Sequence, residues 1–370
     1  MTLAGVEVRE IDERERQYWD AYVQTFAHGH PMNAYDWGKV RRIDGWIPAY
    51  IVAERGGRFC GALLLLMKKL PGLPYRIFCG PHGPVCRPDD RETIRAIHEK
   101  VLELARKNRA IFLRIDPNIR EDEAGAFRRI VADLNYVHLE QRWTFWNSPR
   151  DEYRIDLADA GSVEDIHDAL DRDTRRCIRK GAKDGLLIEP ATSEEDLQAF
   201  YDIFKDFSTT RGFMARGYEY QKKLWECYVA AGRGRLFLAK YQGNIIGGLL
   251  CILYGRKCVA MHMGTPYKYQ KLQTYYAYVW ESIRWAKESG CEWYSFRGVG
   301  TTLTQEAFKK KFNPSVVSLA GYYDCPFRPA LYRLFHWAEF TLLPAAWPLL
   351  VKGRKMASLT IKRLTRQPAL

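Results

Sequence analysis

The chain has 370 residues, of which 47% are hydrophobic and 14% aromatic. Such a composition excludes an intrinsically disordered protein, and the length exceeds what one hydrophobic core serves, so we expect two domains of about 100 to 200 residues each. The 57 Lys and Arg residues outnumber the 44 Asp and Glu residues, and the net charge of +13 favours an anionic partner: nucleic acid, anionic lipid or a phosphorylated substrate.

The cysteine pattern argues against a disulfide framework and against a metal site. Nine cysteines occur, with no C-x-x-C pair and no histidine at ligand spacing. The N-terminal stretch "MTLAGVEVREIDERERQYW" is charged and has no apolar core, so no secretory signal is predicted. We therefore expect a cytoplasmic protein without a bound metal.

A β-hairpin signal occurs twice along the chain. The stretch "VAERGGRFCGALLLL" from Val52 aligns with "LAKYQGNIIGGLLCIL" from Leu238, with one alanine and two glycines at matching places. Each predicts a strand, a glycine turn and a second apolar strand. Helical segments precede both hairpins, "DERERQYWDAYVQTF" and "SEEDLQAFYDIFKDFSTTRGF", and an amphipathic helix and a further strand follow each. The chain is therefore predicted to contain two α/β units related by duplication.

This order of elements resembles the GNAT acyltransferase fold. The fold class is expected to be α/β, with GNAT-like domains at residues 1–152 and 153–328. GNAT enzymes bind coenzyme A through an R/Q-x-x-G-x-G/A loop at a helix N-terminus. The nearest candidate here, Arg42-Ile-Asp-Gly45, is followed by Trp46 and lacks the second small residue. A coenzyme A loop is therefore not predicted.

The stretch after Arg328 differs from the rest of the chain, because it is rich in Trp, Phe and Leu and ends with several basic residues. Its longest uncharged run, residues 340–351, contains two prolines and is too short to span a bilayer, which takes about 20 residues. Residues 329–370 therefore form either an amphipathic helical tail at the inner membrane surface or a helix packed on the first domain. The sequence leaves both open.

Two basic clusters lie in the second half of the chain. "DRDTRRCIRKGAKDG" crowds basic residues on a predicted helix, and the run "EAFKKKF" contains three consecutive lysines. Mutual repulsion disfavours such faces unless an anion neutralises them, although a solvated helix face remains the alternative. The residues expected to contact phosphate groups, of a nucleic acid or of a membrane, are Arg175, Arg176, Arg179, Lys310 and Lys311.

Eight stretches resemble the Fem family, the aminoacyl-tRNA-dependent transferases that add amino acids to peptidoglycan precursors. They are, in family order, "NAYDWGKVRRIDGW", "GPHGPVC", "FLRIDP", "TRRCIRKGAKDG", "TTRGFMARGYEY", "AKYQGNIIGG", "MHMGT" and "EAFKKKF". No long helical arm is predicted between residues 180 and 216, so the chain resembles the armless, monomeric type.

The resemblance implies a set of substrate-binding residues. Arg41, four positions after Trp37, and Arg216 fall where the family holds the diphosphate of the acceptor, and a guanidinium suits bidentate phosphate contacts. Trp37 and Lys39 of the same motif, together with His262, complete this expected set. His262 stands where the family often has Tyr, and Ser295 replaces a common Asp.

The resemblance also implies a catalytic set. The lysine of the family's F-K-x-x-F element falls on Lys309, next to Phe308, where an ammonium stabilises negative charge developing on the ester carbonyl. Asp116 in "RIDP" is a candidate to accept the proton of the amine or to orient the acceptor. A carboxylate at the strand end that pairs with Arg114 is an equal alternative for Asp116.

The implied reaction needs no cofactor, with aminoacyl-tRNA as co-substrate. An amine of a nucleotide-linked (UDP) or lipid-linked peptidoglycan precursor attacks the aminoacyl ester, and the enzyme supplies mainly positioning and charge. Two other classes of function remain open. One is an N-acyltransferase of polysaccharide or lipid biosynthesis, with or without acyl-CoA, and the other is a noncatalytic nucleic-acid or membrane adaptor.

Overall fold

Both predicted hairpins are present in the computed structural model, which describes residues 2–3, 5–140, 150–211, 213, 215–298 and 303–346. Their turns hold Gly57 and Gly243 at φ of 74° and 76°, in the left-handed region that favours glycine. The hairpins are formed by β3 (Trp46–Arg55) with β4 (Arg58–Lys69), and by β11 (Gly234–Tyr241) with β12 (Asn244–Tyr254).

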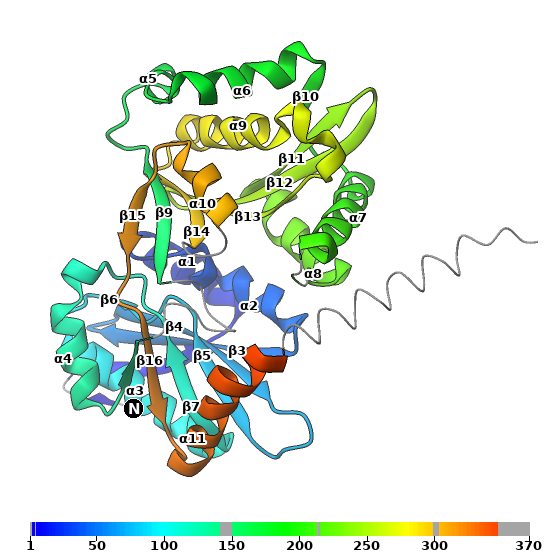
Figure 1. Ribbon diagram of the computed structural model, residues 1–370. Coiled ribbons are helices and arrows are strands. Elements are labelled where there is room, and N and C mark those ends of the chain that lie inside the picture. The colour runs from blue at the N-terminus through cyan, green and yellow to red at the C-terminus, as the bar shows by residue number, and fades with distance from the viewer. Residues whose placement is uncertain are drawn as a thin grey trace, which may run out of the picture.

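Each hairpin belongs to its own mixed sheet (Figure 1). Among the described residues, the first sheet has nine strands in the order β1-β2-β3-β4-β5-β7-β16-β8, with β6 paired to β4. Its other strands are β1 (Thr2–Leu3), β2 (Val6–Ile11), β5 (Arg76–Gly80), β6 (Val85–Cys86), β7 (Ala110–Ile115), β8 (Val137–Leu139) and β16 (Tyr322–Pro326). The second sheet, in the part of the chain that the structure describes, has seven strands in the order β10-β11-β12-β13-β14-β9-β15. Its other strands are β9 (Asp151–Asp156), β10 (Leu186–Pro190), β13 (Lys257–Gly264), β14 (Trp293–Gly298) and β15 (Ser315–Ser318).

Helices cover both faces of the first sheet and both faces of the second. Around the first sheet lie α1 (Arg16–Gln24), α2 (Tyr35–Arg42), α3 (Arg91–Lys107), α4 (Gly125–Asp133) and α11 (Pro329–Trp337). Around the second lie α5 (Val163–Asp168), α6 (Arg172–Lys183), α7 (Glu194–Arg211), α8 (Tyr218–Leu224), α9 (Thr274–Glu288) and α10 (Leu303–Lys310). Short 3₁₀ or π turns are η1 (Glu13–Glu15), η2 (Pro31–Asn33), η3 (Glu121–Glu123), η4 (Trp225–Val229), η5 (Tyr267–Leu272) and η6 (Ala338–Leu342).

The predicted duplication is confirmed by strand direction as well as by element order. In the first sheet β5 and β7 are parallel, and α3 lies between them in the chain. In the second sheet β13 and β14 are parallel, and α9 lies between them. A parallel pair requires such a crossover, so each unit repeats the same antiparallel hairpin followed by one parallel step.

One strand returns from the second half of the chain to the first sheet, which the sequence did not predict. β9, at the boundary expected between the two domains, pairs with β14 of the second sheet. β16, expected within a second domain that ends at residue 328, instead pairs with β7 and β8 of the first sheet. The second domain is therefore not one continuous segment, because the chain returns to the first sheet after β15.

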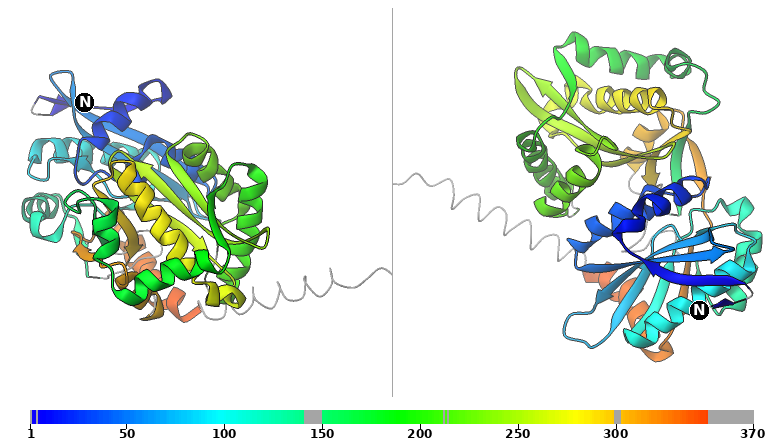
Figure 2. Two further views of the ribbon diagram at one scale, coloured as in Figure 1. Left: turned by 90° about the horizontal axis from the view of Figure 1, so that it is seen from above. Right: turned by 180° about the vertical axis from the view of Figure 1, so that it is seen from behind.

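One hydrophobic core is shared by both units. Trp19 of α1 and Trp37 of α2 belong to the same buried cluster as Phe200 of α7, and the hydroxyl of Tyr254 in β12 donates to Asp20 at 2.8 Å. α1 and α2 lie between the first sheet and the second unit (Figures 1 and 2). The buried apolar contact fixes the position of the two units relative to each other, and this position determines which side chains meet at the site.

The start of the C-terminal segment packs on the first unit. Tyr332 and Phe335 lie against Phe112 with ring centroids 5.5 and 5.1 Å apart, and Glu339 forms a 2.7 Å ion pair with the fully buried Arg114. Of the two arrangements left open for residues 329–370, packing therefore holds for residues 329–342, while residues 347–370 lie outside the described part of the chain. Within the described residues, no helix is long and apolar enough to cross a membrane.

Candidate functional site

The two arginines expected to hold a diphosphate meet at one carboxylate. Arg41, in the last turn of α2, is only 7% exposed, and its Nη1 lies 3.1 Å from Asp44 Oδ2. Arg216, which precedes α8 in the second unit, forms an ion pair with the same Oδ2 atom. The shared core that packs α2 near α8 thus brings together two residues far apart in the sequence.

Lys68 adds a third cation to this cluster. Its Nζ donates to the backbone carbonyl of Asp44 at 2.9 Å and lies 5.5 Å from the ring centroid of Trp46, over which the Arg41 guanidinium also lies at 5.4 Å. Burial lowers the pKa of Lys68; Asp44 opposes this effect, while Arg41 and Arg216 lower the pKa further. Three cations surround Asp44, two of them on its carboxylate and one on its backbone carbonyl, and the positive charge left over suits a ligand with two phosphate groups. We call Arg41, Asp44, Lys68 and Arg216 the cation cluster.

Trp37 and Lys39 do not reach the cation cluster. Trp37 is 4% exposed and packs in the shared core, where it anchors α2. Lys39 pairs with Glu13 and lies 3.4 Å from Asp36. Because successive residues of an α-helix are rotated by about 100°, positions 39 and 41 point to different sides of α2. The expectation that these two side chains bind substrate is not supported by where they lie.

Lys309 is buried at the end of α10. It is 9% exposed, its Nζ donates to the carbonyl of Gly298 at 2.7 Å, and it lies 5.9 Å from the ring centroid of Tyr153. Burial lowers its pKa to about 8; the nearby Arg297 acts in the same direction, and Glu152 acts in the opposite direction. The alternative of a solvated lysine face therefore does not hold for Lys309, although Lys310 is exposed.

A buried carboxylate lies beside Lys309. Glu152 of β9 is 1% exposed, and its Oε2 accepts hydrogen bonds from Ser295 Oγ and from Arg154 Nε, both at 3.1 Å. Burial opposes ionisation of Glu152, but Arg154 and the hydrogen bonds hold its pKa below the ordinary value. Arg297 adopts a φ of 60°, a left-handed conformation that is uncommon for a residue other than glycine. Glu152, Arg297 and Lys309 form what we call the inner cluster.

The inner cluster lies against the first unit. Arg154 donates to Asn118 Oδ1 at 2.7 Å, and the charges of Arg154 and Arg297 both lower the pKa of the buried His30 ring. His30 lies in the first unit, with its ring centroid 3.9 Å from that of His82. The inner cluster is therefore formed where the two units meet.

Asp116 is a buried residue that holds a loop. Its Oδ1 accepts the backbone N–H of His82 at 2.8 Å, and His82 follows β5 at a φ of 50°. For the alternative pairing with Arg114, the register of β16 places Asp324 directly opposite Arg114, and their side chains form two hydrogen bonds of 2.7 and 2.8 Å, so another carboxylate binds that guanidinium. Asp116 fixes the backbone that carries the His82 ring.

His262 lies between the cation cluster and the inner cluster. Its Nδ1 is 3.0 Å from Gln221 Oε1, and its ring contacts that of Tyr220, over which the Arg216 guanidinium lies at 4.7 Å. Burial, together with the charges of Arg297 and Arg216, lowers the pKa of His262 to about 3. His262 is therefore neutral and packs against Tyr220, with one arginine of each cluster near enough to act on its charge.

Phe308 is a packing residue. Its ring lies 5.2 Å from that of Tyr276 and 5.5 Å from that of Phe312, which fastens α10 to α9. Phe308 therefore determines where Lys309 is held, and we expect no direct part for it in the chemistry.

The residues expected to contact tRNA lie on the outer side of the second unit. α6 covers α9 at the end of the molecule away from the first sheet (Figure 1). Arg175 donates to the carbonyl of Asp168 at 2.7 Å, Arg176 pairs with Asp173 at 3.1 Å, and Lys311 pairs with Asp171, the N-cap of α6, at 3.2 Å. Arg179 and Lys310 are exposed. The structure thus brings the lysine run and α6 together.

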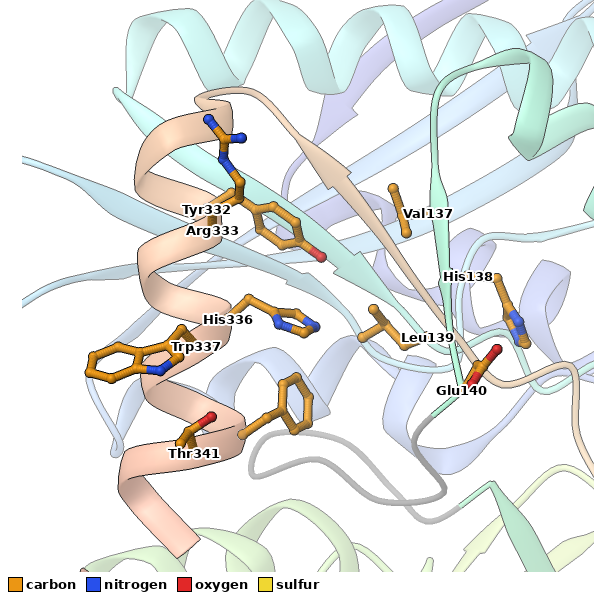
Figure 3. Close-up of a pocket in the computed structure, with 10 residues that line it drawn as sticks. Val137, His138, Leu139, Glu140, Tyr332, Arg333, His336, Trp337 and Thr341 are labelled. Atoms are coloured by element: carbon orange, nitrogen blue, oxygen red, sulfur yellow. The ribbon is translucent and has the colours of Figure 1, made fainter. Parts of the chain in front are cut away.

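A pocket of about 600 Å³ lies elsewhere, between α11 and β8 (Figure 3). His138, His336 and Trp337 are among its lining residues, and no member of the cation cluster or the inner cluster lines it. We assign it no part in the site.

Sequence reasoning missed Asp44, Lys68, Glu152 and Arg297. Lys68 is the β4 partner of Trp46 across the hairpin, and Asp44 precedes Trp46 by two residues in the chain. A basic residue paired with that tryptophan could have indicated the cation cluster. No sequence signal indicated Glu152 and Arg297, because a glutamate or an arginine in a strand ordinarily faces solvent.

Comparisons with known proteins agree with this architecture. The sequence model of the FemAB family matches residues 15–241 and 235–339. A lipid II:glycine glycyltransferase of Staphylococcus aureus is 24% identical over 235 residues, which cover 60% of this chain and 53% of the relative. The chain thus spans about half the length of the curated relatives it matches.

Solved structures show the same fold. The crystal structure of FemX superposes with a TM-score of 0.79 at 19% identity, over 89% of this chain and 99% of that one. A tandem GNAT protein from the clavulanic acid biosynthesis pathway superposes with a TM-score of 0.55 at 14% identity, over 87% and 98% of the two chains. The predicted tandem GNAT-like α/β fold is therefore confirmed. Because the family match extends over both units, the chain belongs to the FemAB family.

Proposed function

We propose that the protein is an aminoacyltransferase that moves an amino acid from aminoacyl-tRNA to an amine of a peptidoglycan precursor, forming a peptide bond. The observation that carries the proposal is the cation cluster: Arg41 and Arg216 come from different units and converge on one point, with Lys68 beside them. A diphosphate-linked acceptor would be bound there by charge-assisted hydrogen bonds. The name of the similar glycyltransferase, whose acceptor is lipid II, supports this class of acceptor.

In the proposed reaction the amine nitrogen of the acceptor attacks the carbonyl carbon of the aminoacyl ester. A C–N bond forms, the bond to the 3′ oxygen of the tRNA breaks, and the proton of the amine passes to that oxygen. Negative charge develops on the carbonyl oxygen, and a fixed cation close to it stabilises the transition state more than the ground state. The Lys309 ammonium, buried beside Arg297, is the group we assign to this task.

The remaining residues act by position. Tyr153 and the carbonyl of Gly298 hold the Lys309 ammonium, and Phe308 packs its helix. Asp116 is assigned to holding the loop of His82 rather than to proton transfer, because its Oδ1 already accepts that backbone N–H. Orientation of two bound substrates supplies much of the rate in such a reaction, since an aminoacyl ester is already activated.

The acyl-CoA alternative is not favoured by the crossover helix of the first unit. α3 is the helix between the parallel strands β5 and β7, so its N-terminus would face a pyrophosphate in a GNAT-like site. That N-terminus is capped by Asp90, whose side chain accepts the Thr93 N–H, and Asp89 precedes it. Two carboxylates at this helix end repel an anion rather than bind it.

The test is a transfer assay with the purified chain, total charged tRNA carrying labelled amino acids, and either a UDP-linked or a lipid-linked precursor. We expect label in the precursor, and we expect ribonuclease treatment of the tRNA to abolish the transfer. Transfer that survives ribonuclease, or that requires acyl-CoA, would refute the proposal. Running the assay with each acceptor separately shows which one the enzyme uses.

A further inference from the structure

One end of the first sheet gathers exposed apolar and basic side chains around the cation cluster. Strand register defines this end: β3 begins at Trp46 opposite Lys68, β4 ends at Lys69 opposite Arg76, and Arg76 also pairs with Ala110 at the start of β7. β16 ends there too, because its last residue, Pro326, lies opposite Phe112. The end of α2, the connection from β4 to β5 and the start of α11 therefore all lie at one end of the sheet.

Three large aliphatic side chains are exposed at this end. Ile43 follows α2, Ile47 lies near the start of β3, and Leu73 lies in the connection from β4 to β5; they are 42%, 45% and 49% exposed. The stretch around Leu73 reads Leu-Pro-Gly-Leu-Pro-Tyr, and Pro71 and Pro74 are exposed as well. Single exposed aliphatic residues need no explanation, but three at one end of a sheet beside a cation cluster do.

The same end is basic. Asp44, a carboxylate at this end, is already engaged by Arg41 and Arg216. Six further cations are exposed around it, and none of them forms an ion pair with a carboxylate of the described residues. They are Arg42, Lys69, Arg106, Lys107, Arg109 and Arg328. A surface with this charge repels other basic surfaces and attracts an anionic layer.

We propose that this end of the first sheet docks on an anionic lipid bilayer. Aliphatic side chains that enter the headgroup layer and basic side chains around them are the combination that binds such a surface. A nucleic-acid surface would use the cations but would gain little from Ile43, Ile47 and Leu73, and for this reason we choose the bilayer. We call these three residues and the six cations the docking face.

The docking face explains how a membrane-linked acceptor reaches the site, and in this respect it rests on the proposed function. The diphosphate of a lipid-linked precursor lies at the level of the headgroups, because its lipid remains in the hydrocarbon layer. Lys68 of the cation cluster is adjacent in sequence to Lys69 of the docking face, and Arg41 is adjacent to Arg42. Docking therefore brings the cation cluster to the plane in which the diphosphate lies. α6, at the opposite end of the molecule, stays in water, where a charged tRNA can reach it (Figure 1).

The test is cosedimentation of the full chain with two kinds of vesicle. One kind contains phosphatidylcholine alone, and the other contains phosphatidylcholine with about 30% phosphatidylglycerol. We expect binding to the anionic vesicles only. Lys69→Gln with Arg109→Gln should weaken it roughly 30-fold, and Leu73→Asp about tenfold or more. Matched controls on the second unit are Lys268→Gln with Lys271→Gln, and Leu187→Asp, all exposed and remote from the docking face. These should bind as the unaltered protein does.

Two further measurements separate the possible outcomes. Amide hydrogen exchange in residues 70–75 should slow on anionic vesicles, and transfer to a lipid-linked precursor in vesicles should fall in the docking-face variants while transfer to a UDP-linked precursor is unchanged. Equal vesicle binding by docking-face and control variants would overturn the proposal, as would loss of tRNA binding instead of vesicle binding. Vesicle binding that depends on the docking face in a protein without transfer activity would refute the proposed function alone.

Discussion

Arg216 of the second unit and Asp44 of the first unit form an ion pair across the boundary between the units, and Arg41 joins the same carboxylate oxygen. The carboxylate holds two guanidinium groups in place, one from each unit. A diphosphate that binds there meets arginines that are already positioned, so little side-chain entropy is lost on binding. The site is in this sense preorganised.

The cation cluster predicts the effect of removing either arginine. Arg41→Ala and Arg216→Ala should each raise the KM for the acceptor by roughly 10- to 150-fold, because one charge-assisted hydrogen bond contributes about 1.5 to 3 kcal/mol. Steady-state kinetics with a UDP-linked acceptor measure this effect. Arg42→Ala is the matched control, since Arg42 adjoins Arg41 but is exposed. Acceptor kinetics that are the same in all three variants would exclude the cluster as the diphosphate site.

The buried position of Lys309 predicts a loss of turnover. Lys309→Met keeps the length of the side chain and removes its charge, so kcat should fall roughly 100- to 1000-fold, with a smaller change in acceptor KM. Lys310→Met is the matched control, because its side chain is exposed one residue further along α10. Single-turnover rates with preformed aminoacyl-tRNA check the result. Equal, salt-sensitive losses in both variants would mean that the lysine run only docks tRNA.

The lowered pKa of Lys309 predicts a pH dependence. Burial lowers this pKa to about 8, and the protonated form is the one assigned to catalysis, so kcat/KM should decline as the pH rises through about 8. An ordinary lysine would lose its proton only near its usual pKa of 10.5. Lys309→Arg keeps the charge at all accessible pH values and should remove this decline in kcat/KM, whatever the rate of the variant at neutral pH. A decline that persists in Lys309→Arg would mean that a group other than Lys309 causes it by titration.

The position of α6 predicts salt-dependent tRNA binding. Arg179→Gln and Lys310→Gln should each raise the KM for charged tRNA several-fold at about 50 mM salt, and the effect should shrink near 200 mM because exposed phosphate contacts are screened. Lys271→Gln, also exposed on the second unit, is the control. The KM for the UDP-linked acceptor should stay constant. An effect that does not change with salt would contradict a peripheral phosphate contact.

The buried ion pairs of Arg114 predict a large loss of stability. Arg114→Met leaves Asp324 and Glu339 buried without their cation and should lower the free energy of unfolding by about 3 to 5 kcal/mol. Glu339→Gln is the control: its amide oxygen still accepts from Arg114, and Asp324 still balances the charge, so the loss should be small. Urea unfolding measures both. Similar losses in the two variants would show that Glu339 carries the stability rather than Arg114.

The sequence predicted those parts of the fold that depend on local rules. Gly57 and Gly243 occupy left-handed turns, which few other residues adopt, so the two hairpins and their duplication could be recognised. The placement of β16 could not be predicted, because its five residues carry no pattern that distinguishes one sheet from the other, and its partner is chosen by packing. Asp324 could not be recognised as the partner of Arg114 for the same reason, since it reaches Arg114 through β16.

For the site, the family resemblance indicated Arg41, Arg216 and Lys309, and it also indicated side chains that pack elsewhere. Lys39 and Phe308 stand in the same motifs, but the rotation of a helix and the packing of α10 on α9 turn them away. The carboxylates Asp44 and Glu152 were missed, because their importance depends on partners supplied by other elements.

The return of β16 and α11 to the first sheet sets an order for biosynthesis. The chain leaves the ribosome from its N-terminus, yet among the described residues β8 is joined to β7 only through β16, and the ion pairs of Arg114 are those with Asp324 and Glu339. The unit that is translated first is therefore completed last. Until β16 has emerged, the nascent protein presents an open β7 edge, a template for pairing with other chains that a ribosome-associated chaperone would have to cover.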